Sequence, residues 1–194
     1  MKTKSKLFGG MVVLFVLCSG CSHNVAFQKP DAYKYETTIS LKAGFYMDKI
    51  LKEKIYSGRA FSSGIENRWD VPIGDTIHTY AVSYLKNGFV AFCEIEDVSI
   101  KQNCDVVIKV DDINYYMKDQ AAHCDVSFVI ENTSGKQVFN KKYHADGPSG
   151  YVKVILAGPF AQKSAIRQST QVVLENILKD FMNDVRTSFT NWEK

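Results

Sequence analysis

The sequence predicts an α+β fold, a two-layer sandwich in which a mostly antiparallel sheet of about four to six strands is backed by two helices. Apolar residues recur at helical spacing after Pro72 and again near the carboxyl terminus. Between these segments, apolar and polar residues alternate with a period of two, which is typical of half-buried strands. Helices with one apolar stripe and strands with one apolar face bury each other as two layers.

The first predicted strand covers residues 35–47, where Tyr35, Ile39 and Ala43 belong to one alternating row. Residues 48–71 show no clean period. Their glycine and serine clusters favour loops around a short strand at about 55–61.

A helix is predicted from Pro72 to Asn87. Asp75 in its first turn suits the helix dipole, and Gly88 can adopt the left-handed conformation that helix ends often need. One face of this helix carries the apolar residues Ile73, Ile77, Tyr80, Ala81, Tyr84 and Leu85.

Strands are then predicted at 89–98, 104–117, 123–131 and 136–145. The last three form an antiparallel meander over residues 105–145, with a tight turn at 132–135. A long helix follows at about 161–189. Its wide apolar stripe indicates that it lies across the sheet, and the stripe contains Ile166, Val173, Leu174, Ile177, Leu178, Phe181, Met182, Val185 and Phe189.

The first 21 residues are similar to a bacterial lipoprotein signal. Three lysines precede a short apolar run at 7–17, and small residues precede Cys21. Such a run is too short to span a bilayer core of about 30 Å. A charged start, an apolar core and a small-residue cleavage site together mark a processed export signal.

We therefore expect residues 1–20 to be removed and Cys21 to carry the lipid, with 21–32 as a tether and 33–190 as one periplasmic domain. The alternative is an ordinary signal peptide, with Cys21 as an unmodified thiol. Ser22 follows the cysteine, and by resemblance to lipoproteins of Gram-negative bacteria this implies the inner leaflet of the outer membrane. More than one acyl chain makes such attachment stable.

The charge of the chain argues against nucleic-acid binding. Removal of the three lysines in residues 1–20 leaves 21 basic residues, equal to the 21 acidic ones. No block of lysine and arginine remains to neutralise phosphates.

Three cysteines follow Cys21, namely Cys93, Cys104 and Cys124. An exported compartment permits one disulfide among them, with Cys93–Cys104 and Cys104–Cys124 both conceivable. The alternative is three buried thiols. No C-x-x-C pair remains after signal removal, so we expect neither a redox pair nor a zinc site.

No catalytic or metal site is expected. The four histidines are scattered without a metal-binding spacing, and no nucleophile elbow or glycine-rich phosphate loop occurs. The only cofactor expected is the covalent lipid on Cys21.

Residues 67–75 (Asn-Arg-Trp-Asp-Val-Pro-Ile-Gly-Asp) and 104–108 (Cys-Asp-Val-Val-Ile) carry a resemblance to a known group of proteins. They are similar to segments of auxiliary lipoproteins of ABC-type envelope transport systems and of the YajG-like lipoprotein family. The resemblance implies a sheet backed by two helices and an accessory role in an envelope complex. It supplies no catalytic residues.

Four residues are candidates for contact with a partner or ligand: Trp69, Tyr116, Val154 and Leu156. Trp69 could anchor a partner or close the core. Tyr115 and Tyr116 should point to opposite faces of a strand, which leaves one of them exposed. The apolar segment 151–160 could be an edge strand, a covered loop or an exposed flap that meets a partner or an acyl chain.

These features predict a non-catalytic lipoprotein that binds an envelope protein, with the lipid raising its concentration near that partner. The alternatives are a carrier of an apolar ligand, with 151–160 as its lid, and a periplasmic enzyme.

Overall fold

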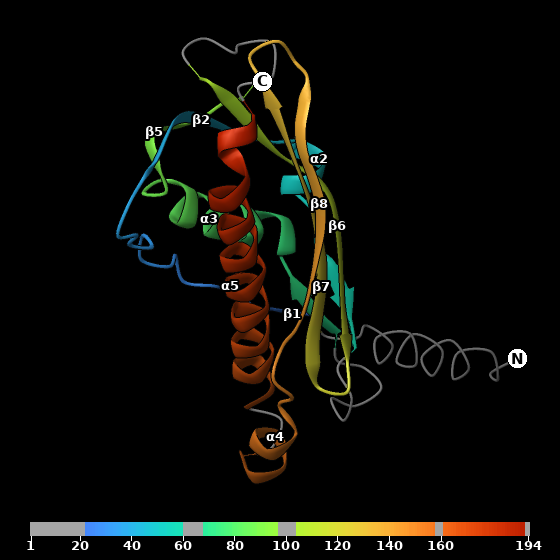
Figure 1. Ribbon diagram of the computed structural model, residues 1–194. Helices are drawn as coiled ribbons and strands as arrows, with labels where there is room; N and C mark the ends of the chain where they lie inside the picture. The colour runs from blue at the N-terminus through green and yellow to red at the C-terminus, as the bar shows by residue number, and fades with distance from the viewer. Residues whose placement is uncertain (1–21, 60–67, 97–103, 158–160, 193–194) are drawn as a thin grey trace, which may run out of the picture.

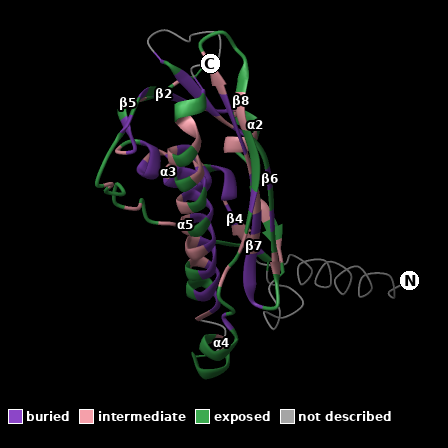
Figure 2. Cartoon of the chain, in the orientation of Figure 1, coloured by how far each residue is buried: buried purple, intermediate pink, exposed green. Residues whose placement is uncertain are grey.

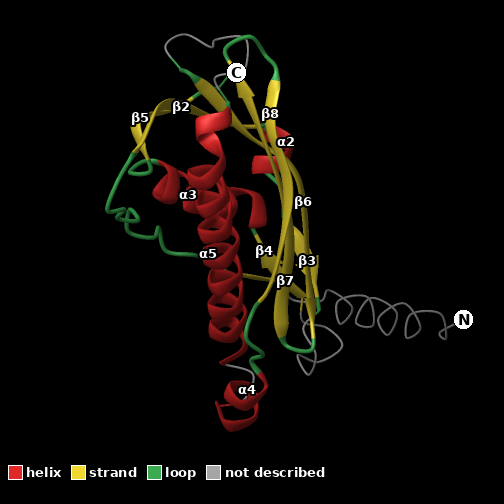
Figure 3. Ribbon diagram, in the orientation of Figure 1, coloured by secondary structure: helices red, strands yellow, loops and turns green. Residues whose placement is uncertain are grey.

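The computed structural model describes residues 22–59, 68–96, 104–157 and 161–192 (Figure 1). Helices cover one face of a five-stranded sheet, and the fold also contains a separate three-stranded sheet. Figure 3 shows the strands and the long helix as two layers. The predicted α+β sandwich is confirmed, and the larger sheet has a number of strands within the expected range. The prediction that the sheet is mostly antiparallel is not met, because two of its four strand pairs are parallel.

The larger sheet has the order β5-β2-β6-β7-β8 and is mixed. Its second strand β2 (Ile39–Met47) lies between β5 (Phe89–Glu94) and β6 (Val106–Lys118) and runs parallel to both. The remaining pairs are antiparallel and form the predicted meander, which is completed by β7 (Ala121–Asn132) and β8 (Gln137–Asp146).

The turn between β7 and β8 lies where the sequence predicts it. Gly135 has φ 80°, a conformation that glycine adopts without steric cost. The Asn132 side chain accepts hydrogen bonds from Ser134 Oγ at 2.7 Å and from the Lys136 N–H at 3.0 Å. The turn chemistry therefore sets the register of the hairpin.

Helices α3 (Ile73–Leu85) and α5 (Gln162–Ser188) cover the inner face of this sheet, with their apolar stripes turned inward (Figure 2). The Phe181 ring of α5 stacks on the Phe128 ring of β7, with centroids 4.1 Å apart. Burial of each such side chain contributes roughly 1.5–3 kcal/mol. Both helices lie where the sequence predicts them, and the short turns α2 (Lys49–Lys52) and η2 (Phe189–Asn191) accompany them.

The smaller sheet has the order β1-β4-β3. It consists of β1 (Ser22–Asn24), β4 (Arg68–Val71) and β3 (Tyr56–Gly58). Tyr56 joins it to β6, because its ring lies 5.1 Å from that of Tyr115 and its hydroxyl accepts the Met117 N–H at 3.4 Å.

The first residues of the predicted tether at 21–32 that the structure describes, 22–25, pair with the domain, whereas 26–32 have no regular structure. β1 pairs in parallel with β4, and the Val25 N–H donates to the Asp70 carbonyl at 2.9 Å. The Val25 side chain is fully buried. A three-residue strand with one apolar residue after it carries too little periodicity to be recognised in a sequence.

Residues 151–157 form a helix, α4 (Tyr151–Ala157), and neither an edge strand nor a covered loop. Its side chains are exposed except for the half-buried Val154, and Figure 2 shows α4 standing apart from the buried core. The sequence alone is compatible with an edge strand, a covered loop or an exposed flap. The structure confirms that residues 151–157 are exposed. Residues 158–160, which belong to the same predicted segment, lie outside the described residues.

The molecule has two ends, which lie at opposite ends of α5 (Figure 1). The α4 end comprises α4, the β6–β7 turn at residues 119–120 and the adjoining β1-β4-β3 sheet. The distal end comprises the β7–β8 turn and Trp192. Because α5 has 27 residues, it extends for about 40 Å.

Candidate functional site

Helix α4 gathers apolar side chains on the surface. Val152 is 70% exposed, Ile155 75% and Leu156 81%. These positions are spaced three and four residues apart, so they share one face of the helix. Single exposed apolar residues are ordinary, but a contiguous apolar face marks an interaction surface.

A groove of about 380 Å³ separates α4 from the first turns of α5. Val152, Leu156 and Ala165 contribute its apolar lining. Lys153 lies at its rim, where the ammonium donates to Ser164 Oγ and to Gln168 Oε1, both at 3.1 Å. The groove therefore has apolar walls and the ammonium group of Lys153 beside them.

The segment that leads into α4 is held against the β6–β7 turn. The Gly150 N–H donates to the Gln120 carbonyl at 2.9 Å, and Ser149 Oγ donates to the Asp119 carbonyl at 3.0 Å. Asp119 and Gln120 both have positive φ, of 50° and 60°. Such values cost energy in residues other than glycine, and the buried contact between the Gln120 and Gln162 amides holds this turn in place.

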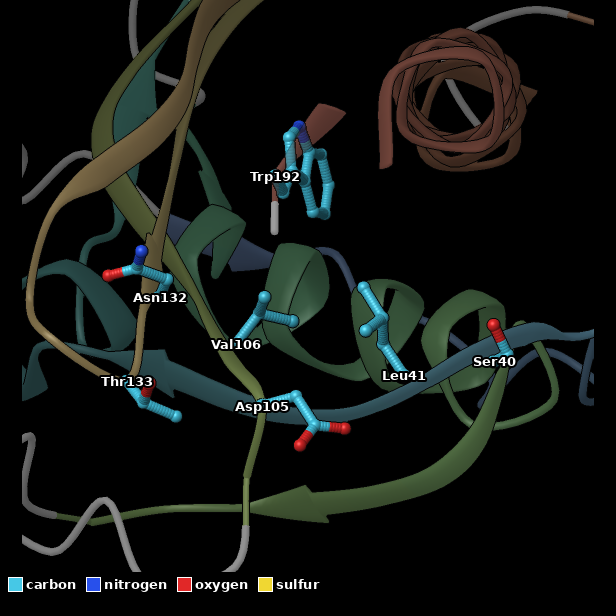
Figure 4. A pocket seen from close by; sticks show the side chains of 7 residues that line it. All are labelled: Ser40, Leu41, Asp105, Val106, Asn132, Thr133 and Trp192. Carbon is cyan, nitrogen blue, oxygen red and sulfur yellow. The ribbon is translucent and has the colours of Figure 1, made fainter. Parts of the chain in front are cut away.

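A second depression, of about 370 Å³, lies at the distal end. Figure 4 shows side chains from β2, the start of β6, the β7–β8 turn and the carboxyl-terminal segment around it. Asp105 is fixed there because its carboxylate accepts the Lys42 N–H at 2.7 Å. The lining combines polar and apolar groups and consists of Ser40, Leu41, Asp105, Val106, Asn132, Thr133 and Trp192.

Two of the three cysteines that follow Cys21 are in contact. The Sγ atoms of Cys93 and Cys104 lie 3.3 Å apart, and both cysteines are free thiols in this structure. Burial raises the pKa of Cys104 to about 11, and the neighbouring Cys93 adds to this effect. Cys124 lies opposite Tyr115 on β6, and this register places it roughly 30 Å along the sheet from Cys104. Of the two conceivable disulfides, only Cys93–Cys104 is compatible with this fold.

The outer face of β7 and β8 carries a cluster of two histidines and two aspartates. His144 Nδ1 lies 2.7 Å from Asp125 Oδ1, and its Nε2 lies 3.0 Å from Asp146 Oδ1. His123 Nδ1 lies 2.5 Å from the same Asp146 oxygen. The hydrogen bond with Asp125 and the charges of both carboxylates raise the pKa of His144.

The pKa values of the two aspartates in the cluster shift in the opposite direction, downward. At Asp125, partial burial opposes ionisation, but hydrogen bonds from Asn114, His144 and Lys142 outweigh it and lower the pKa. Hydrogen bonding from His123 lowers the pKa of Asp146. Within the described part of the chain, no group of three or more His, Cys, Asp or Glu side chains is arranged to hold a metal ion.

The structure separates the four predicted contact residues. Trp69 is buried in the core, with its ring 5.1 Å from that of His23, so the core interpretation applies to it. Tyr115 is buried and Tyr116 is exposed, as the strand alternation predicts, and Tyr116 stacks on His123 at 4.8 Å. Val154 and Leu156 lie on α4. The predicted residues therefore do not form one site.

The histidine–aspartate cluster was not predicted, although the sequence contains a signal for it. His123 and Asp125 are two residues apart, as are His144 and Asp146. A spacing of two places both side chains on one face of a strand, and pairing of the two strands then brings the four groups together.

No helix among the described residues combines the length and the apolar character needed to cross a membrane. No family model matches the sequence, and no curated protein matches it.

Solved structures with a related arrangement include the hypothetical protein CT253 from Chlamydia trachomatis, with a TM-score of 0.42 and 6% identity over 77% of this chain and 98% of that chain. A dodecamer of a PelC variant from Paraburkholderia phytofirmans has a TM-score of 0.34 and 15% identity over 68% and 95%. A structure described as an uncharacterized protein has a TM-score of 0.36 and 12% identity over 82% and 97%. Likenesses at this level assign neither a family nor a function to the chain.

Proposed function

We propose that this protein is a non-catalytic accessory lipoprotein, anchored by a lipid on Cys21 at the periplasmic face of the outer membrane, and that its domain binds a protein of an envelope complex. The observation that carries the proposal is that β1 follows Cys21 directly in the sequence. Strand β1 starts at Ser22 and pairs with β4. A lipid on Cys21 would therefore hold the domain against the bilayer with almost no spacer.

Such attachment works by raising the local concentration of the domain near its partners. The distal end, with its depression around Asp105 and Thr133, faces away from the attachment point in this arrangement. An envelope protein can reach this surface without displacing the lipid anchor.

The geometry gives less support to a carrier that encloses an apolar ligand between the sheet and α5. Phe128 and Phe181 stack there at 4.1 Å, and both side chains are fully buried. The described core is filled by its own side chains. The histidine–aspartate cluster gives no support to an enzyme, because both ring nitrogens of His144 face carboxylates and neither faces a nucleophile.

The test is in-cell photocrosslinking from Thr133 at the distal end, with exposed Lys142 on the outer face of β8 as the control position. We expect one envelope protein to crosslink from residue 133 and not from residue 142. Cys21→Ala should abolish labelling by radioactive palmitate and reduce this crosslink, because the chain is then no longer concentrated at the membrane. The matched control Cys93→Ala should keep both signals.

Palmitate labelling that persists in Cys21→Ala would contradict the anchor. No partner from residue 133, with labelling intact, would contradict the accessory role and leave the anchor standing.

A further inference from the structure

Helix α4 keeps apolar side chains exposed to solvent. Val152, Ile155 and Leu156 are exposed, and Val154 is half-buried. Other large exposed apolar residues, such as Ile50 on α2 and Val90 on β5, lie on separate elements. A concentrated apolar face of this kind calls for an occupant.

The position of α4 relative to β1 indicates what that occupant is. Gly150, which precedes α4, contacts Gln120 in the β6–β7 turn. At the end of the same β6 strand, Met117 contacts Tyr56 of β3. From β3 to β1 there are two strand spacings, about 10 Å in total. Strand β1 and α4 therefore lie in the same half of the molecule, and Figure 1 shows β1 beside the lower part of α5 with α4 below it.

The charged residues of the segment that contains α4 and the first half of α5 are all basic, although Asp119 of the adjoining β6–β7 turn is acidic. Residues 147–174 contain Lys153, Lys163 and Arg167 but no aspartate or glutamate. Lys153 and Lys163 are exposed. An apolar face next to lysine side chains is typical of helices that lie in the interface of an anionic membrane, where apolar groups enter the acyl boundary and cations meet phosphate headgroups.

We propose that α4 lies in the lipid interface of the same membrane that carries Cys21, so that the domain is fixed at two points. This inference rests on the proposed lipid anchor. A lipid on Cys21, one residue before β1, brings the α4 end to the bilayer. The apolar side chains of Val152, Ile155 and Leu156 then enter the lipid instead of remaining in water. A single anchor permits the domain to tumble, whereas two contacts fix which end faces outward.

The test uses the full chain purified from membranes and reconstituted into vesicles of phosphatidylethanolamine and phosphatidylglycerol, with either brominated or ordinary phosphatidylcholine. Bromine quenches an indole only when the two are close. Leu156→Trp places a reporter on α4. Val90→Trp, at an exposed position 63% accessible on β5 near the distal end, is the matched control. The native Trp69 and Trp192 are buried and give the same background in both variants.

We expect the added fluorescence of Leu156→Trp to be largely lost in brominated vesicles and that of Val90→Trp to be kept. If both variants float with the vesicles but neither is quenched, the anchor stands and the position of α4 in lipid is wrong. If Leu156→Trp shifts to the blue without quenching while light scattering shows a doubled mass, a second copy of the chain covers α4, which also overturns the inference. Failure of either variant to float with the vesicles overturns the anchor, and the inference with it.

Discussion

Gly44 on β2 permits the contact between Cys93 and Cys104. It lies opposite Cys93 in the sheet, and a Cβ atom at this position would be 3.1 Å from Cys104 Sγ. Because glycine has no side chain, the two thiols can meet across β2. In an oxidising compartment, thiol–disulfide exchange with an oxidised dithiol donor would convert this pair to a disulfide and reduce the donor to two thiols.

We expect the exported protein to contain a Cys93–Cys104 disulfide and a free Cys124. The bond would close a loop between positions 11 residues apart, which stabilises the fold by about 2–3 kcal/mol relative to the reduced protein. Alkylation before and after reduction, followed by peptide mass spectrometry, identifies the pair. Cys93→Ser should lower the unfolding midpoint of the oxidised protein but barely change it after reduction. Two reactive thiols at these positions in the exported protein would contradict the prediction.

The histidine–aspartate cluster makes stability depend on pH in a defined direction. The raised pKa of His144 means that the folded state favours its protonated form. This contribution is fully present below about pH 6.5 and is lost as the pH rises through the higher folded-state pKa. The lowered pKa of Asp125 contributes above about pH 4 and is lost as the pH falls through its folded-state value.

The stability of the native protein relative to His144→Gln should therefore be greatest between about pH 4 and 6.5, and the difference should disappear at pH 8–9. Because His144 is largely exposed, solvent screens the interaction and the difference in melting temperature should be on the order of 1 °C. Thermal unfolding of both proteins across this range measures it. A difference that grows toward alkaline pH would show that the imidazole stabilises the fold when neutral.

Side-chain alternation allowed Tyr115 and Tyr116 to be assigned to opposite faces from the sequence, and the structure confirms it. Side-chain alternation cannot predict whether Trp69 is buried or exposed. Its burial depends on the pairing of β4 with β1 and β3, and that pairing joins segments far apart in the chain.

Among the helices, α5 could be predicted and α4 could not. A stripe of buried residues that continues from Ile166 to Val185 spans several turns, so its period is clear. Helix α4 has seven residues, three of them the β-branched Val152, Val154 and Ile155, which favour a strand locally. Its helical state and its exposure are set by contacts at its start, which the sequence does not reveal.

The two helices should respond very differently to the same substitution. Leu174→Ala on α5 removes a fully buried side chain and should lower the free energy of unfolding by about 2–5 kcal/mol. Leu156→Ala on α4 removes an exposed one and should change it by less than about 0.5 kcal/mol. Urea unfolding of both variants under the same conditions provides the comparison. A similar loss in both would mean that α4 packs against the core.

For the molecule as a whole, the sequence predicted the layers, the meander and both long helices, because each depends on a local pattern. It did not predict that β2 enters the sheet between β5 and β6 and runs parallel to both. Nor did it predict the β1-β4-β3 sheet. Strand order is decided by packing between distant segments, for which one sequence carries no direct signal.

The length of α5 has a consequence for where this protein can act. Its 27 residues separate the α4 end from the distal end by about 40 Å. With α4 in lipid and α5 upright on the bilayer, the depression around Thr133 would be held at that height above the membrane. The domain would then set the distance from the membrane at which a partner is bound. It would select partners by how far they project into the periplasm as well as by the chemistry of their surfaces.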